Sequence, residues 1–168
     1  MYEELLIRRS VRKYKPDQIT EEQLDAVLEA GLYAPTAKNN QKPVKVAVRD
    51  KETRDLLSRI NAEIMDVDTD PFYGAPCVIV VLADPDMPTW IDDGSLVLGN
   101  LMNAAHALGL GSCWINRARQ TFDRPEGKAL LEKWGLPERY RGVGNCILGY
   151  ADEVPVPQER LAGRIIKV

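Results

Sequence analysis

The chain has 168 residues, of which 45% are hydrophobic and 28% are charged, with a net charge of −3. This length predicts one domain, residues 1–168, that is large enough to bury a hydrophobic core. The acidic balance argues against a general nucleic-acid binder, and no apolar run reaches the ~18 residues of a membrane-spanning helix.

The start of the chain and its cysteines indicate a cellular compartment. Met1 leads into Tyr-Glu-Glu without the apolar stretch of a signal peptide. Cys77, Cys113 and Cys146 are odd in number, widely separated and each set in an apolar run. We therefore expect buried, reduced thiols and a cytoplasmic protein.

The first predicted element is a short helix over residues 2–9, with Leu5 and Leu6 turned inward. It runs into Arg8–Arg12 (RRSVR), where three arginines and a hydroxyl fall within five residues. The guanidinium group is a planar fork suited to phosphate oxygens, and neighbouring backbone N–H groups can close a small anion cradle. Taken alone, such a cluster is more typical of a solvated basic patch.

A helix and a second polar stretch follow. Thr20 and Gln23 form the ends of a capping box that opens a helix ending before Pro35. The loop Pro35–Gln41 (PTAKNNQ) is rich in side-chain amides, which both donate and accept hydrogen bonds, as the edge of a planar heterocycle requires. A phosphate-binding segment and an amide-rich segment joined by a helix suggest a phosphorylated heterocyclic cofactor. The Asn39-Asn40 pair alone is also typical of a plain turn.

Helices and strands alternate irregularly along the rest of the chain. Helix 93–108 is apolar almost all round and is therefore predicted to be a buried core helix, while strand 77–83 is predicted to be central. This mixture predicts an α+β domain. The remaining predicted elements are strand 44–48, helix 51–65 capped by Asp50, strand 112–116, helix 126–134, strand 143–148 and a terminal strand 164–168.

Metal chemistry has little support. The series Asp66, Asp68 and Asp70 hints at a calcium loop, but Pro71 stands where the turn glycine belongs and Cys77 where the bidentate acid belongs. We therefore interpret the series as a polar loop. The single histidine, His106, lies in the core-helix pattern with no ligand at a standard spacing.

Other catalytic constellations are also weak. A Cys113–His106 nucleophilic pair lacks an orienting third group. Asp92-Asp93 is most simply a helix N-terminus, where acids favour the helix dipole. Gly109-x-Gly111 follows a helix and opens a strand, the reverse of a dinucleotide-binding fingerprint. We name no catalytic side chain and no metal site.

Four motifs in register resemble the FMN-dependent nitroreductase family, of which this chain looks like a short member. They span nearly the whole sequence. The matching segments are Arg8-x-Ser10-x-Arg12, Pro35-Thr36-Ala37-x-Asn39-x-Gln41, the run Leu108–Ile115 (LGLGSCWI) and Leu148-Gly149-Tyr150.

The resemblance implies a mainly antiparallel sheet flanked by helices around a buried core helix, in an intertwined homodimer. FMN would lie at the interface, and the arm 151–168 would embrace the partner subunit. It implies an oxidoreductase that uses NADH or NADPH to reduce nitroaromatics, quinones or related electrophiles by a ping-pong hydride mechanism, with flavin N5 as the reacting atom.

The resemblance also assigns residues to the cofactor. The phosphate side would be held by Arg8, Ser10 and Arg12, with Arg9 beside them, and by Arg160. A backbone N–H near flavin N5 would come from the segment at Ile115 and Asn116. The ring-binding loop would contribute Pro35, Thr36, Ala37, Asn39 and Gln41.

Two departures from the family pattern keep alternatives open. Gln41 is followed by Lys42-Pro43-Val44 rather than by a bulky aromatic residue, and segment 61–73, which often forms a lid, is short. One alternative is therefore a flavin-binding sensor or carrier protein without efficient turnover. A further alternative is a cofactor-free interaction module whose arginines meet an anionic partner.

Overall fold

The computed structural model describes residues 2–168. Its centre is a four-stranded sheet in the order β1-β2-β4-β3, in which every neighbouring pair is antiparallel. The strands are β1 (Val44–Val48), β2 (Cys77–Ala83), β3 (Gly111–Ile115) and β4 (Arg141–Gly149). The α+β class and the antiparallel sheet are therefore confirmed.

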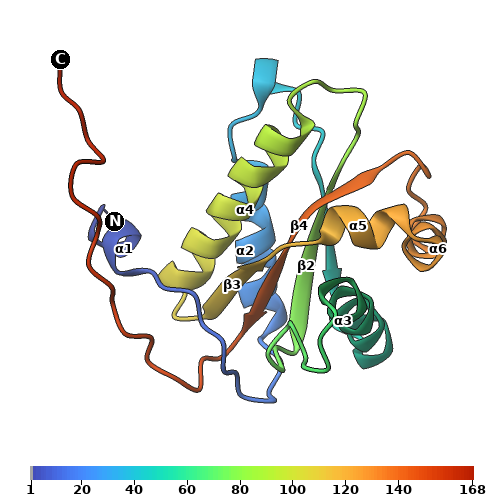
Figure 1. The fold of residues 1–168 in the computed structure, drawn as a ribbon, viewed down its shortest axis with the longest axis horizontal. Coiled ribbons are helices and arrows are strands. Elements are labelled where there is room, and N and C mark those ends of the chain that lie inside the picture. Colours follow the sequence, from blue (N-terminus) through green and yellow to red (C-terminus); the bar gives the residue numbers. More distant parts are fainter. Residues whose placement is uncertain (1) are drawn as a thin grey trace.

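Helices cover both faces of the sheet (Figure 1). On one side lie α2 (Glu21–Leu32) and α4 (Trp90–Ala107), which pack on one hydrophobic cluster with the alternate residues of β2 and β4. On the other side lie α3 (Lys51–Met65), α5 (Ala118–Asp123) and α6 (Pro125–Lys133). Every residue of β2 is buried, as a strand covered on both faces requires.

The helix start signals in the sequence are confirmed. The Thr20 side chain accepts from the Gln23 backbone while the Gln23 side chain accepts from Thr20 N, so the predicted capping box opens α2. The Asp50 side chain accepts from Thr53 N at 2.8 Å and caps α3.

Helix α4 departs from the prediction of a core helix. It begins at Trp90, before the expected start. Its inner face is buried through residues such as Leu101, but Ile91 and Leu96 are 45% and 47% exposed. Helix α4 is apolar around most of its circumference because it has a second apolar face, which the rest of this chain does not cover.

Both termini also differ from expectation. Helix α1 (Tyr2–Ile7) forms, but no residue in it is buried, so the inward placement predicted for Leu5 and Leu6 is wrong. Residues 164–168 form no strand and lie exposed in an extended arm that passes beside α1 (Figure 1). In each case the apolar side chains stay more than half exposed within this chain.

Two further sequence expectations concern burial and turns. The three cysteines are free and buried, as predicted. Burial raises the pKa of the Cys77 thiol to about 12, which keeps it protonated. The Asp70 carboxylate accepts hydrogen bonds from the Ser58 hydroxyl, Phe72 N and Gly74 N, which supports the interpretation of segment 66–70 as a polar loop.

Among residues 2–168, no helix combines the length and apolarity needed to cross a bilayer.

Candidate functional site

The arginine-rich segment after α1 is fixed along the edge of the sheet. Ser10 forms a parallel bridge with Ser112 of edge strand β3, and Val11 N donates to Ser112 O at 3.0 Å. A Cβ on Gly111 would lie 3.0 Å from the Val11 side chain, so the close approach of the two segments favours glycine there.

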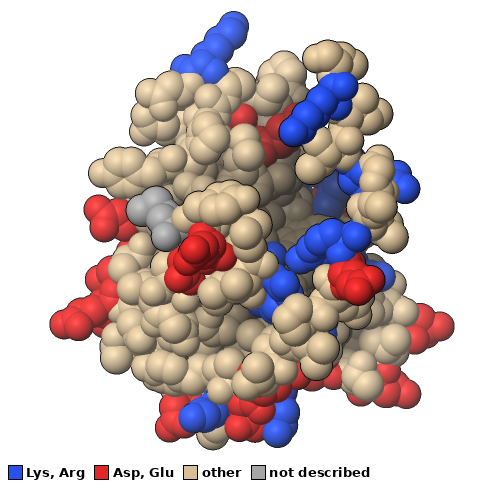
Figure 2. All heavy atoms as spheres, turned by 90° about the vertical axis from the view of Figure 1, so that its left-hand side faces the viewer, with Lys and Arg blue, Asp and Glu red and all other residues tan. Residues whose placement is uncertain are grey.

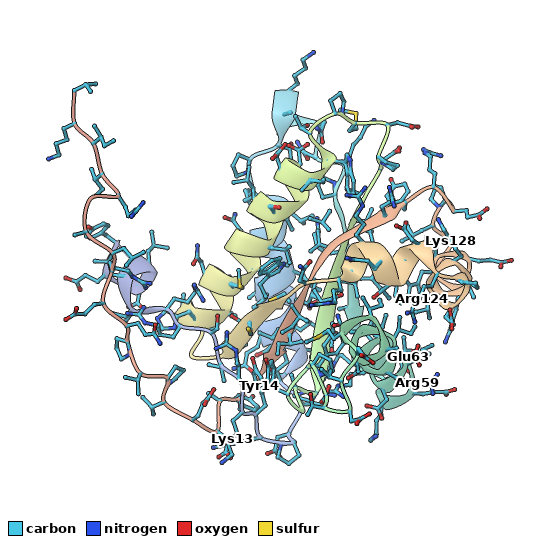
Figure 3. All side chains as sticks on the ribbon, in the orientation of Figure 1. Lys13, Tyr14, Arg59, Glu63, Arg124 and Lys128 are labelled. Carbon is cyan, nitrogen blue, oxygen red and sulfur yellow. The ribbon has the colours of Figure 1, made fainter. Side chains whose placement is uncertain are left out.

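The next residues tie the segment to the end of β4. Tyr14 is buried, forms a bridge with Ala151 and donates from its hydroxyl to Val11 O at 2.7 Å. Lys13 pairs with Asp152 at 2.8 Å. Figure 3 shows Lys13 and Tyr14 at this lower end of the molecule. The backbone of residues 8–12 is therefore held from two sides.

A cavity of about 320 Å³ lies beside this segment. Arg8 and Arg9 line it together with His106, Ser112 and Glu153. Arg8 Nη1 and Arg9 Nε are buried and have no hydrogen-bond partner. Because an unpartnered buried guanidinium nitrogen is costly, these atoms fit a cavity that takes an anion.

Glu153, at the start of the arm, is a residue that the sequence did not single out. Its Oε1 accepts from the backbone N–H of Arg12. A carboxylate at this N–H shows that the Arg12 backbone presents a donor to an anionic group. It also places a negative charge on the wall of the same cavity.

The second predicted group, the loop around η1 (Ala37–Asn39), has an unusual backbone. Lys38, Asn39 and Gln41 have φ values of 53°, 52° and 52°, in the left-handed region. Asn39 and Gln41 are exposed, and Gln41 Nε2 donates to Asn39 Oδ1 at 3.0 Å. The loop therefore presents a pair of amides to the outside in a defined orientation.

Asn40 points the other way, toward Asp93 in the first turn of α4. Its Nδ2 donates to Asp93 Oδ2 at 2.7 Å, and Ala37 N donates to Asp93 Oδ1 at 2.9 Å. Burial alone would raise the pKa of the Asp93 carboxyl, but hydrogen bonds from Asn40, Ala37 and Thr89 outweigh burial and hold that pKa below its usual value. The dipole interpretation of Asp92-Asp93 missed this contact.

Ile115 and Asn116 lie at the far end of β3 from Gly111. Asn61 of α3 is fully buried and donates from Nδ2 to Asn116 O at 2.9 Å. Asn116 Oδ1 accepts from Arg117 N at 2.7 Å. Along the strand, Ser112 and Asn116 are separated by roughly 13 Å. The edge of β3 thus runs from the arginine-lined cavity to this turn.

Segment 8–12 and loop 35–41, the two larger groups of sequence-predicted residues, lie at opposite ends of α4, whereas Ile115 and Asn116 lie at the end of β3. The loop 36–41 contacts Asp93, near the start of the helix, and the arginine-lined cavity contains His106, near its end. These positions are roughly 20 Å apart along the axis, and Figure 1 shows the loop and residues 8–12 at the two ends. Arg160 lies on the exposed arm. One chain does not bring all these residues together.

Charged side chains of both signs lie on the side of the molecule that carries α1 and the arm. Figure 2 faces this side and shows Lys and Arg side chains beside a hollow near the centre, with Asp and Glu side chains toward the left and lower edges. On the opposite side, the charged residues labelled on α3 and near α6 in Figure 3 include the pair Arg124–Glu63, 2.8 Å apart.

Within residues 2–168, no cluster of three or more His, Cys, Asp and Glu side chains is arranged to hold a metal ion.

Comparison with known proteins identifies similar chains. Residues 5–150 match the model of the nitroreductase family. An Archaeoglobus fulgidus protein named NADH dehydrogenase/NAD(P)H nitroreductase is 34% identical over 149 residues, covering 85% of this chain and 80% of that protein.

Solved structures are similar over the whole length. A nitroreductase with bound FMN from Bacteroides fragilis superposes with a TM-score of 0.89 and 32% identity, covering 99% of this chain and 97% of that one. An FMN-dependent nitroreductase from Clostridium difficile gives a TM-score of 0.83 and 31% identity, covering 100% and 98% of the two chains.

Proposed function

The chain belongs to the nitroreductase family, and from this premise we propose that it is an FMN-dependent oxidoreductase. In this proposal, NADH or NADPH is the reductant and a small electrophile, such as a nitroaromatic compound or a quinone, is the acceptor. The observation that carries the proposal is the cavity of about 320 Å³ with its unpartnered arginine nitrogens, beside the edge strand of a fold shared with FMN-bound proteins.

The residues around the cavity fit the phosphate of FMN. Arg8 and Arg9 offer buried nitrogens without partners, and Ser10 lies between them and Arg12 in the same segment. Hydrogen bonds between charged partners are shorter and about twice as strong as neutral ones. These residues would hold the phosphate, and Arg160 of the arm would add a further charge.

The exposed amides of Asn39 and Gln41 fit the pyrimidine edge of the flavin ring, which alternates N–H and C=O groups. When bound, FMN would supply the redox chemistry, which is hydride transfer between the nicotinamide and the acceptor. Asn61 holds the Asn116 carbonyl and so fixes the turn whose backbone N–H would meet the ring near N5.

A second copy of the chain would complete the site. The two groups of residues are too far apart along α4 for one small ligand to reach both within one chain. A two-fold partner would place its loop 36–41 against the arginine-lined cavity of the first chain. The apolar residues that a single chain leaves exposed, on α1, on α4 and along the arm, would then be covered; they include Leu5, Leu6, Ile7, Ile91, Leu96, Leu161, Ile165 and Ile166.

The test is the absorption spectrum of the purified protein, followed by NADH and NADPH oxidation with menadione or a nitroaromatic compound. We expect flavin bands, release of FMN on heating and turnover with at least one nicotinamide. Bound FMN without turnover across both nicotinamides and several acceptors would favour a sensor or carrier. A colourless protein that FMN does not stabilise would contradict the proposal.

A further inference from the structure

The carboxylate of Asp93 is buried at the junction of α4 and the loop 36–41. Asp93 is 3% exposed. Its Oδ1 accepts from Ala37 N at 2.9 Å, and its Oδ2 accepts from Asn40 Nδ2 at 2.7 Å and from Thr89 Oγ1 at 3.1 Å. The acid thus connects two points of the loop to the helix.

The loop needs such a connection because its backbone is strained. Three of its non-glycine residues lie in the left-handed region, a conformation that persists only where surrounding contacts fix it. Within the loop, Gln41 N donates to Thr36 Oγ1 at 3.0 Å and Lys42 N donates to Asn40 Oδ1 at 2.9 Å. These bonds shape the loop, and the Asp93 bonds set its position on α4.

Adjacent side chains of the loop therefore have different tasks. Asn40 is turned inward and bound to Asp93, while Asn39 and Gln41 on either side of it are exposed and bound to each other. A shift of Asn40 would move both exposed amides. The orientation of the amides thus depends on a carboxylate that does not reach the outside.

We propose that Asp93 is a positioning residue for flavin binding, which holds the loop 36–41 so that Asn39 and Gln41 meet the ring. This inference rests on the proposed function. It assigns Asp93 to the ring and not to the phosphate, because the arginine-lined cavity lies at the other end of α4.

A carboxylate is required because the loop presents donors to both of its oxygens. Asp93→Asn has the same shape but one acceptor oxygen, so its NH₂ group faces either Ala37 N or Asn40 Nδ2, a donor against a donor. The exchange Asp93→Asn with Asn40→Asp restores the pairing with reversed polarity. In that double variant the amide oxygen at position 93 accepts from Ala37 N, and the NH₂ group of the same amide donates to the new carboxylate at position 40.

The experiment measures the dissociation constants of FMN and of riboflavin, which has the same ring but no phosphate. We expect Asp93→Asn to weaken both by a similar factor of about tenfold, whereas Arg12→Ala weakens FMN and leaves riboflavin unchanged. Asp92→Asn is the matched control, because Asp92 is the exposed neighbour with the same charge in the same helical turn. It should leave both constants unchanged.

The double exchange should restore most of the affinity for both ligands. Unchanged FMN and riboflavin affinities in a folded Asp93→Asn variant would overturn the inference, as would failure of the double exchange to improve binding. If Asp93→Asn does not fold, Asn40→Ala carries the test with the same expected loss for both ligands. A wild-type protein that binds neither FMN nor riboflavin would instead overturn the proposed function, and this inference with it.

Discussion

Glu153 is the acidic residue on the wall of the arginine-lined cavity. Its carboxylate accepts from Arg12 N and lines the same space as Arg8 and Arg9. A phosphate bound there would meet this negative charge. Glu153 therefore limits the affinity of the cavity for anions while helping to hold the arm.

Glu153→Gln tests this effect, because it keeps an acceptor oxygen for Arg12 N and removes the charge. We expect the FMN dissociation constant to fall roughly two- to fivefold, equivalent to about 0.5–1 kcal/mol at a partly solvated site. Fluorescence titration measures it. Riboflavin is the control ligand, and its affinity should not change. A weaker or unaltered affinity for FMN would show that Glu153 does not oppose the phosphate.

The lowered pKa of Asp93 predicts how its contribution to stability depends on pH. A carboxyl whose pKa is lower in the folded state than in the unfolded state stabilises the folded protein when it is ionised. This stabilisation is fully present above the unfolded pKa of about 4 and is lost as the pH falls toward the folded pKa. The difference in unfolding free energy between wild type and Asp93→Asn should therefore be constant near neutral pH. It should shrink below about pH 4.

Urea unfolding of the two proteins at several pH values measures this difference. The Asp92→Asn variant, altered at an exposed acid, should show a small difference from wild type at each pH. A wild-type advantage over Asp93→Asn that grows as the pH is lowered would contradict the assignment.

The elements that the sequence predicted well carry local or strongly patterned signals. The capping box of α2 and the continuous apolar run of β2 are examples, because a cap is local and burial on both faces leaves no polar positions. Helix α5 was missed because it is six residues long and its N-cap residue, Arg117, has a φ of 74° and makes no side-chain capping bond. The position and type of the long elements were therefore easier to predict than those of the short elements that connect them.

The site was predictable in part for the same reason. The motif residues of segments 8–12 and 35–41 could be chosen from local composition. Asp93 could not, because its loop partners Ala37 and Asn40 lie 56 and 53 residues away in sequence. The inward placement of Leu5 and Leu6 failed because apolar residues do not reveal whether their own chain or another covers them.

The packing of α4 on β4 depends on a glycine. A Cβ on Gly94 would lie 2.6 Å from Val143 Cγ2. Gly→Ala in a helix usually stabilises by about 1 kcal/mol, but overpacking costs ~1–3 kcal/mol. We expect Gly94→Ala to lower the unfolding free energy by about 1 kcal/mol, measured by denaturant unfolding.

The double variant Gly94→Ala/Val143→Ala is the control for this prediction. Removing the Val143 methyl groups makes room for the new Cβ, so the double variant should be more stable than the sum of the single effects predicts. Strict additivity of the two substitutions would show that the close contact does not limit packing.

At the scale of the whole molecule, the arm is extended and exposes apolar residues. Leu161, Ile165 and Ile166 are 76%, 82% and 86% exposed. We expect deletion of residues 160–168 to weaken a homodimer, because the deletion removes apolar side chains that would pack on the partner. Light scattering over a range of protein concentrations measures the change.

Full-length variants separate the apolar side chains from the length of the arm. Replacing Leu161, Ile165 and Ile166 by serine should weaken the dimer as the deletion does. Arg164→Gln, which leaves the apolar residues in place, should not. An intact dimer after the deletion would refute the role of the arm.

The separation of the two groups of residues along α4 leads to the central claim, that two chains form each flavin site. The direct measurement uses two variants with different tags, Arg8→Ala/Arg12→Ala and Asn39→Ala/Gln41→Ala, co-expressed and purified by both tags. Each variant alone should bind FMN poorly, whereas the mixed dimer contains one site with both wild-type halves. We predict about one FMN per mixed dimer at wild-type affinity. A mixed dimer that binds FMN no better than its parents would contradict the shared site.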